Sequence, residues 1–355
     1  MKQPITAGDI LERLVSIESP SGSEGEAADA LTAIAEAAGL QVQRLDNNIW
    51  FSIGEGPKTL LLNSHLDIVP ASEGHPYPPF EPTIVDGWLY GRGAVDAKGS
   101  VASMTAAVLR LHAEGWSPKG GRLVGAFTAC EESGWPYNGL EVTRPHLPPV
   151  SAAIVGEPTD LEPCVAQKGV LILRLDARGK SAHAARPHLG DNAVVKASRD
   201  VVRLSEFQPD RAHPELGLVT VTSTVMQGGA ARNVIPDLCS VHVDVRSTPA
   251  YTHAELVALV QAQVESEVVI HSDRLIPVDT SPDSEIVRAA VAASGGQPFG
   301  SPTASDWIFL SDVPTVKMGP GSSDLSHTAG ERMNLNELER AVDVYRNTIL
   351  HYFGS

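Results

Sequence analysis

The sequence predicts an α/β protein of two domains, in which a layered α/β/α domain with a mostly parallel sheet carries an inserted α+β domain. The first observation is an alternation of apolar, strand-like runs with helical patterns over residues 1–165, which resumes after residue 282. The second is a different order between them: strand, helix, strand, strand, helix, strand. We therefore assign residues 1–165 and 278–355 to the larger domain and residues 166–277 to the insertion.

The larger domain shows both kinds of apolar pattern. Helical spacing of apolar residues predicts helices over 7–17, 26–39, 98–115 and 336–352. Short apolar or β-branched runs predict strands over 42–45, 49–53, 59–62, 122–129 and 152–156. The last two runs are apolar almost throughout, which is typical of parallel strands that are covered on both faces.

The insertion has a simpler pattern. We expect strands over 170–179, 219–229 and 239–247, and helices over 191–206 and 253–267. Loop-like stretches near 160–166 and 272–282 mark its two edges. This order is that of the split βαβ arrangement, so we predict a ferredoxin-like insertion.

Composition narrows the class of protein. The 355 residues are 42% hydrophobic and 20% charged, a balance typical of soluble globular domains, and no run of about 18–20 apolar residues predicts a membrane span. The N-terminal stretch MKQPITAGDILERL lacks the apolar core of a secretion signal. Three cysteines, an odd number, indicate a reducing compartment rather than a disulfide framework, so we expect a cytoplasmic protein: Cys130, Cys164 and Cys239.

The net charge of −16 argues against a nucleic-acid partner, because phosphates require a basic surface. An acidic surface can attract a cationic small substrate. The simpler interpretation is that the charge keeps the protein soluble.

Histidine and acidic residues follow several of the predicted strands. His65 and Asp67 stand two apart after the strand at 59–62, so both side chains can point to one side. Asp96 lies in the glycine-rich stretch GRGAVDAKGS before a helix, where it could also be an ordinary N-cap. Each signal by itself is equally typical of a surface loop.

Further carboxylates follow the next strands. Glu131 and Glu132 end the run FTACEE, and burial of two adjacent carboxylates is costly without a cation, although a solvated pair is the simpler alternative. Glu157 follows the next strand, and His327 lies in the loop SSDLSHTAGE. Oxygen and imidazole ligands without thiolates suit zinc, manganese or cobalt at a hydrolytic centre. Two such ions would require a bridging carboxylate.

These motifs together resemble the M20 metallopeptidase family. SHLDIVP, GRGAVDAKGS, TACEESG, IVGEPT and HTAGE occur in the family's order along nearly the whole chain. The resemblance implies two divalent metal ions, with Zn²⁺ expected and Co²⁺ or Mn²⁺ as alternatives. It implies that Asp96 bridges the two ions. His65 and Glu157 would complete one site, and Glu132 and His327 the other.

The same resemblance implies catalytic roles for two more residues. Glu131 matches the family's general base. Asp67 would orient His65 by accepting its second N–H.

The insertion also resembles that family's smaller domain, which implies a homodimer formed through it. His183 in GKSAHA would stabilise the oxyanion in the partner subunit's site, or else be an ordinary surface histidine. Asn233 matches a substrate-contacting asparagine. Arg246 matches an arginine that binds the substrate α-carboxylate, with an ion pair to Asp244 or Asp237 as the alternative. Gly321 lies in KMGPGSSDLSHT, where we expect it to shape the substrate pocket together with Gly319.

The substrate is the least determined feature. Glu157 in place of an aspartate is similar to the deacylases and desuccinylases of the family, and VKMGPGSSDLSHTA resembles its short acetylornithine deacetylases. The resemblance therefore implies a small N-acyl amino acid as substrate, with N-acetyl-L-ornithine of arginine biosynthesis first. Desuccinylases, dipeptidases and carboxypeptidases of the family are alternatives. A non-catalytic metal-binding protein is disfavoured, since it would not need Glu131.

Overall fold

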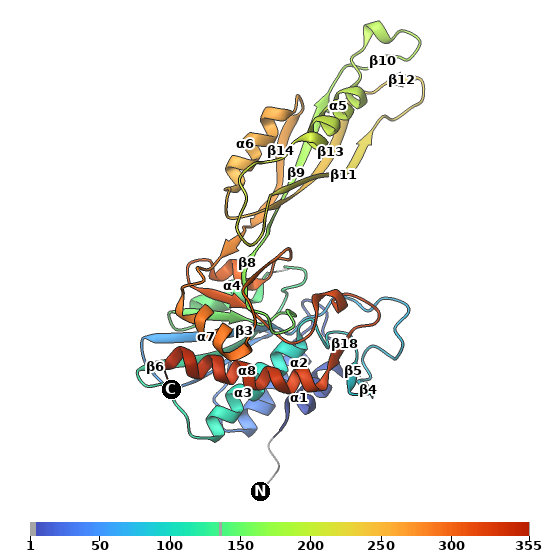
Figure 1. The fold of residues 1–355 in the computed structure, drawn as a ribbon. Helices are drawn as coiled ribbons and strands as arrows, with labels where there is room; N and C mark the ends of the chain where they lie inside the picture. Colours follow the sequence, from blue (N-terminus) through green and yellow to red (C-terminus); the bar gives the residue numbers. More distant parts are fainter. Residues whose placement is uncertain (1–4, 135–136, 355) are drawn as a thin grey trace. The chain divides into compact units, whose positions relative to one another are not determined.

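The computed structural model describes residues 5–134 and 137–354. The chain divides into two compact units, which Figure 1 colours along the sequence. Unit 1 comprises Met1–Val165, Thr280–Phe299 and Ser305–Ser355, and unit 2 comprises Ala166–Asp279 and Gly300–Ala304. The expected insertion spanned 166–277, so its second edge lies slightly later, and the stretch Gly300–Ala304 joins unit 2, which the sequence pattern did not predict.

Unit 1 is built on a sheet with the strand order β1-β2-β6-β3-β7-β17-β8. Its central strands are mutually parallel: β6 (Gly121–Thr128), β3 (Lys58–His65), β7 (Ala152–Val155) and β17 (Thr315–Lys317). At one edge, β1 (Gln43–Leu45) and β2 (Asn48–Ile53) continue the sheet antiparallel. Every residue of β3 from Thr59 to His65 is buried, so both faces of the sheet are covered, as the sequence predicts for parallel strands.

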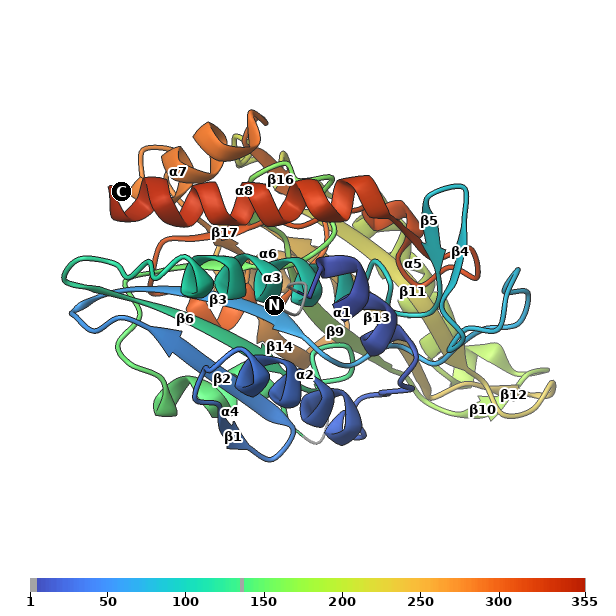
Figure 2. The ribbon, with the colours of Figure 1, turned by 90° about the horizontal axis from the view of Figure 1, so that it is seen from below.

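Helices cover both faces of this sheet. Figure 1 shows α1, α2, α3 and α8 on one side of β3 and α4 on the other, and Figure 2 looks from below onto the side that carries α1, α2, α3 and α8. The helices of unit 1 are α1 (Ala7–Val15), α2 (Gly25–Ala37), α3 (Lys98–Ala113), α4 (Gly139–Thr143), α7 (Glu285–Ser294) and α8 (Leu335–Phe353). Their sequences explain their starts: the Thr6 hydroxyl and the Asp9 carboxylate form a capping box at α1, and Asn334 caps α8. The predicted α/β/α layering is confirmed.

Unit 2 is an antiparallel sheet with two helices, which fits the predicted inserted domain. The strand order is β11-β13-β9-β14, with β9 (Gly169–Arg178), β11 (Thr220–Gly228), β13 (Leu238–Ser247) and β14 (Glu267–Leu275). Burial alternates along β9 and β13, and the buried face packs against α5 (Ala193–Glu206) and α6 (His253–Gln263). The chain order β-α-β-β-α-β is the one predicted.

One predicted element in unit 2 is too long. The sequence pattern extended the second helix to residue 267, but α6 ends at Gln263 and β14 begins at Glu267. The run Val268–Ile270 is β-branched and pairs with β9, so sheet formation takes precedence over continuation of the helical pattern.

Short elements complete the two units. The strands β4 (Thr83–Val85), β5 (Trp88–Tyr90) and β18 (Arg332–Asn334) form a small sheet, and β10 (Ala182–His183) pairs with β12 (Val234–Ile235). The remaining strands are β8 (Cys164–Gln167), β15 (Val278–Asp279) and β16 (Phe299–Ser301). The 3-10 turns are Arg144–His146, Pro187–Leu189, Asp306–Leu310 and Ser323–Leu325. Within 5–134 and 137–354, no helix is both long and apolar enough to cross a membrane.

Candidate metal centre

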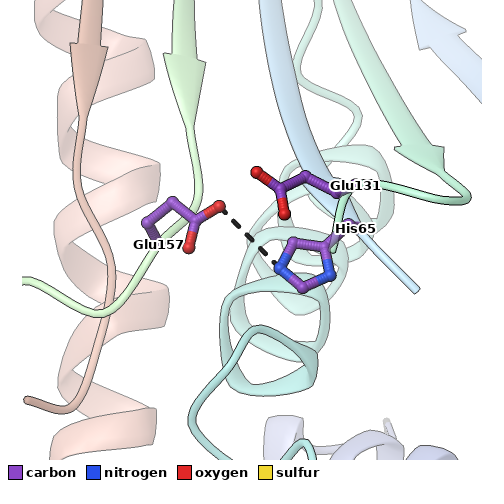
Figure 3. A group of neighbouring side chains, drawn as sticks. All are labelled: His65, Glu131 and Glu157. Carbon is purple, nitrogen blue, oxygen red and sulfur yellow. Dashed lines mark ion pairs between the residues drawn. The ribbon is translucent and has the colours of Figure 1, made fainter. Parts of the chain in front are cut away.

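The predicted ligands all lie in unit 1, at strand ends and at the turns beside them. His65 is the last residue of β3, Glu131 and Glu132 follow β6, and Glu157 follows β7. Because β3, β6 and β7 are parallel, their carboxyl ends meet at one edge of the sheet, where α/β folds place ligands. Figure 3 shows the side chains of Glu131 and Glu157 directed toward the His65 ring.

Asp96 stands between two groups of ligand atoms. Its Oδ1 lies 3.2 Å from His65 Nε2, and that nitrogen lies 3.8 Å from Glu157 Oε1. Its Oδ2 lies 3.4 Å from His327 Nε2, which is itself 3.0 Å from both carboxylate oxygens of Glu132. One carboxylate oxygen therefore faces His65 and Glu157, and the other faces His327 and Glu132.

Asp67 contacts more groups than the sequence implied. The His65 Nδ1 lies 3.0 Å from the Asp67 main-chain oxygen and 3.4 Å from its Oδ1, so the main-chain oxygen is the closer partner. The carboxylate also accepts hydrogen bonds from the backbone N–H groups of Glu131 and Glu132, at 3.1 and 3.0 Å. The Ser21 hydroxyl donates to it at 2.7 Å. Asp67 thus holds the turn that carries both glutamates as well as the imidazole.

Negative charge is concentrated at this edge of the sheet. Burial raises the pKa of Glu131 well above its usual range, and the neighbouring Glu157 carboxylate raises it further. Burial and then Asp96 raise the pKa of Glu132 to about 7. Burial, opposed by His65, raises that of Glu157 to about 8. Carboxylates in this setting resist ionisation unless a cation is present.

For the two histidines and Asp96 the pKa shifts favour the charged form, whereas those of the three glutamates favour the neutral form. Burial alone would lower the pKa of His65, but hydrogen bonds with Asp67 and Asp96 outweigh it and raise the pKa well above its usual value. A hydrogen bond with Asp96 is the main cause that raises the pKa of His327 to about 9. Burial opposes ionisation of Asp96, yet the two imidazoles lower its pKa. The protonated imidazoles thus supply positive charge to the neighbouring carboxylates, and bound cations could supply that charge in their place.

This donor set fits divalent metal ions. The ligand atoms of His65, Asp96 and Glu132 all lie within 4.8 Å of one another, as do those of His65, Glu131 and Glu157. Imidazole nitrogens and carboxylate oxygens are the ligands of zinc, cobalt and manganese sites. The second group includes Glu131, so distance alone does not separate the predicted base from the predicted ligands.

The predicted site residues of unit 2 fall into two places. His183 and Asn233 are both exposed. His183 lies in β10 opposite Val234, and Asn233 directly precedes β12, where its main-chain oxygen accepts a hydrogen bond from the Ala184 N–H at 2.9 Å. Arg246 lies at the far end of β13 and forms the alternative ion pair, with Nε 2.8 Å from Asp244 Oδ1 and Nη2 3.2 Å from Oδ2.

Gly321 and Gly319 are favoured as glycine for different reasons, the first by its backbone angle and the second by close packing. Gly321 has φ +81°, and its N–H donates to Glu337 Oε1 at 2.8 Å. A Cβ on Gly319 would lie 2.2 Å from Ser100 Oγ and 2.6 Å from the Glu157 main-chain oxygen. The backbone of Gly319 therefore packs directly against the segment that carries Glu157.

Sequence reasoning missed several supporting residues. Ser326 donates a hydrogen bond from its hydroxyl to Asp96 Oδ2, and Glu331 contacts the backbone around Asp96. Cys130 and His327 adopt left-handed backbone angles, with φ 58° and 61°, which are uncommon for residues other than glycine and often occur at functional sites. Glu331 stands in the quoted motif HTAGE, but nothing in the motif indicates what its side chain touches.

Comparison with known proteins agrees with this geometry. The family described as Peptidase family M20/M25/M40 matches residues 61–351. The succinyl-diaminopimelate desuccinylase of Cereibacter sphaeroides (strain KD131 / KCTC 12085) is 30% identical over 384 residues, covering 99% of this chain and 100% of the relative. The acetylornithine deacetylase of Myxococcus xanthus is 31% identical over 322 residues, covering 85% of this chain and 82% of the relative.

Solved structures share the fold. Aminopeptidase PepT from Bacillus cereus ATCC 10987 has a TM-score of 0.80 at 20% identity, with 98% of each chain covered. The Bacillus subtilis YXEP protein, described as a dinuclear metal binding peptidase from the M20 family, has a TM-score of 0.72 at 17% identity, with 96% of each chain covered. Because the family match spans residues 61–351 and a relative at 30% identity aligns with 99% of the chain, this protein belongs to the M20/M25/M40 peptidase family of hydrolases.

Proposed function

We propose that this protein uses two divalent metal ions to remove an N-acyl group from an amino acid, with N-acetyl-L-ornithine as the first candidate substrate. The observation that carries the proposal is the orientation of Asp96, whose two oxygens face two different imidazole–carboxylate pairs. A carboxylate placed in this way can bridge two cations, which suits hydrolysis of an amide.

Each residue of the centre has a proposed role. His65, Glu157 and one oxygen of Asp96 would hold one ion, and Glu132, His327 and the other oxygen would hold the second. Zn²⁺ is the expected ion, with Co²⁺ and Mn²⁺ as alternatives. When bound, the two ions would polarise the acyl carbonyl and make an attacking water more acidic.

Glu131 is the proposed general base. Its carboxylate lies close to the ligand atoms of His65 and Glu157. It would accept a proton from the attacking water and then deliver that proton to the leaving amine. Asp67 would keep Glu131 in place through the hydrogen bond from the Glu131 backbone N–H.

Unit 2 would supply the remaining substrate contacts. His183 would stabilise the oxyanion, Asn233 would contact substrate or oxyanion, and Arg246 would exchange its ion pair with Asp244 for one with the substrate α-carboxylate.

The positions of His183 and Arg246 within unit 2 support a dimer. His183 lies on the β10–β12 pair, which precedes the start of β13 at Leu238, whereas Arg246 lies near the end of β13. Eight steps along a strand at ~3.3 Å each separate the two ends by roughly 26 Å. One copy of unit 2 therefore cannot bring both side chains to one small substrate, and we propose that His183 completes the partner subunit's site in a homodimer.

The substrate proposal rests on similarity. The two relatives above carry the names of a desuccinylase and a deacetylase at 30% and 31% identity, and both names denote removal of an acyl group. A net charge of −16 suits a substrate with a cationic side chain, such as acetylornithine, and with it a role in arginine biosynthesis. The small, odd number of cysteines, all three of them buried, fits the proposed cytoplasmic location.

Turnover of a panel of amides by the metal-loaded protein tests the proposal. The panel contains N-acetylornithine, N-succinylornithine, N-acetylcitrulline, succinyl-diaminopimelate and dipeptides, compared by kcat/KM. We expect the highest value for N-acetylornithine. A higher value for succinyl-diaminopimelate would identify a desuccinylase instead, and a preference for dipeptides would exclude the deacylase proposal.

A further inference from the structure

Glu331 and Arg92 form a buried ion pair beside the candidate metal centre. Arg92 Nη1 lies 2.6 Å from Glu331 Oε2, and the two side chains are 1% and 0% exposed. Within the described residues, Nε and Nη2 of Arg92 have no other hydrogen-bond partner. Glu331 is therefore the carboxylate that pairs with this guanidinium.

The second oxygen of Glu331 holds the loop that carries Asp96. Oε1 accepts hydrogen bonds from the backbone N–H groups of Val95 and Asp96, at 3.0 and 3.1 Å. The backbone of Gly93 also contributes to this carboxylate's environment. Arg92 thus engages Oε2, while Oε1 accepts from the two backbone donors.

The same segment also carries a predicted metal ligand. Glu331 follows Ser326, which donates its hydroxyl proton to Asp96 Oδ2, and His327, whose Nε2 lies 3.4 Å from that oxygen. The Glu331 main-chain oxygen accepts from the Gly91 N–H at 3.3 Å. The segment 326–331 is thus connected to the 91–96 loop both through the Asp96 side chain and through the backbone next to it.

We propose that Glu331 is a positioning residue that sets the direction of the Asp96 carboxylate, and with it the affinity for both metal ions. The proposal rests on the two-metal function proposed above. Asp96 is the one ligand shared by both predicted sites, so a rotation of its backbone moves both of its oxygens. Loss of Glu132 or Glu157 would remove a ligand from one ion only. Loss of the Glu331 contact should lower the affinity for both ions together. Replacement of a residue that holds a metal ligand in place typically lowers metal affinity by about 10–100-fold.

Two double variants isolate the hydrogen-bond acceptor from the ion pair. Arg92→Met with Glu331→Gln removes both charges and keeps an oxygen that can accept from Val95 and Asp96. Arg92→Met with Glu331→Met removes both charges and the acceptor at similar volume. Neither variant leaves one member of the Arg92–Glu331 pair as an unpaired buried charge, which would itself destabilise the fold. Asp200→Asn in unit 2 is the matched control, because Asp200 is a buried carboxylate that accepts the backbone N–H groups of Glu265 and Ser266, both at 3.0 Å.

The readout is Zn²⁺ binding to metal-free protein by calorimetry, without substrate. We expect the Gln double variant to bind both ions within about threefold of wild type, and the Met double variant to bind both at least tenfold more weakly. Asp200→Asn should lower the melting temperature of the metal-free protein and leave both affinities unchanged. If the Met double variant does not fold, Glu331→Asp serves in its place. The shorter side chain cannot reach both Arg92 and the backbone N–H groups, so we expect the affinity for both ions to fall in the same way.

Different outcomes would contradict the role of Glu331 and the two-metal function on which it rests. Equal affinities in the two double variants, or wild-type affinities in Glu331→Asp, would overturn the role of Glu331 while wild type binds two ions. A lower affinity for only one of the two ions would also overturn the role of Glu331, because a change in the shared Asp96 carboxylate should affect both. A wild-type protein that binds fewer than two equivalents would instead overturn the two-metal function.

Discussion

At the residue scale, Glu131 and Glu132 show how neighbouring residues of one type acquire different environments. Glu132 faces His327, with both carboxylate oxygens 3.0 Å from the ring nitrogen, whereas Glu131 lies among His65 and Glu157. Their backbone N–H groups are both held by Asp67. The turn therefore directs adjacent side chains to separate partners, which allows one to act as a base and the other as a ligand.

Replacement of Glu131 by glutamine should separate catalysis from metal binding. The amide keeps the shape of the side chain but cannot accept the proton of the attacking water, so we expect kcat to fall by about 10²–10⁴-fold. Metal content measured on the same preparation should remain at two ions per subunit. Turnover close to wild type would exclude Glu131 as the base, and loss of one ion would make it a ligand.

Ligand variants should distinguish the shared carboxylate from the others. Asp96→Asn is expected to weaken binding of both ions, because each of its oxygens faces a different imidazole. Glu157→Gln should weaken only the ion held with His65. Cobalt absorption spectra recorded during titration measure the two sites in turn. If Asp96→Asn removed one ion and left the second intact, the bridging role would be wrong.

At the scale of elements, the strands and helices bring the site together through their ends. The ends of β3, β6 and β7 supply His65, the two adjacent glutamates and Glu157, and the start of α3 follows Asp96. The start of α8 braces the neighbouring segment, because Glu337 accepts the Gly321 N–H. Secondary-structure boundaries are thus part of the site.

The N-cap of α8 offers a test at this scale. The Asn334 side-chain oxygen accepts from the N–H groups of Asn336 and Glu337, at 3.0 and 3.2 Å. Asn334→Ala should lower the free energy of unfolding by about 1 kcal/mol, measured by urea denaturation, whereas Asn334→Ser should retain most of it because serine also caps helices. Equal losses in the two variants would show that the cap does not stabilise α8.

At the scale of the whole molecule, bound metal ions should stabilise the fold. The carboxylates of the centre have raised pKa values without a cation, so their charges oppose folding when they ionise. Free metal at 100 times its Kd should add about 2.7 kcal/mol to the free energy of unfolding. Thermal denaturation with and without a chelator measures this difference. Asp96→Asn is the control, and a chelator effect of equal size in that variant would place the stabilising ions elsewhere.

A mixture of two inactive variants tests the dimer. His183→Ala and Glu131→Gln, if His183 acts in the partner's site, form heterodimers in which one of the two sites has both residues intact. An equimolar mixture after subunit exchange should recover about a quarter of wild-type activity, since half of the dimers would be mixed. No recovery, or a fully active monomer in sedimentation, would contradict the cross-subunit role.

Much of this protein follows from local patterns in its sequence. The period of apolar residues predicted most of the longer helices and strands of both units. It misled at the end of the second helix of unit 2, which was expected to reach residue 267 but ends at Gln263, before β14 begins at Glu267. The candidate ligands His65, Asp96 and Glu157 could be proposed from the sequence because metal sites use particular residue types and α/β folds place ligands at strand ends.

The sequence by itself determined the layered fold class, the residue types of the centre and their order along the chain, since these depend on local periodicity and on motifs. The tertiary structure decided which oxygen of Asp96 faces which imidazole, that Asp67 also holds the Glu131–Glu132 turn, and that Glu331 accepts from the backbone beside Asp96. The Arg92–Glu331 pair joins residues 239 positions apart. Such contacts depend on the packing of distant segments, and no local pattern specifies them.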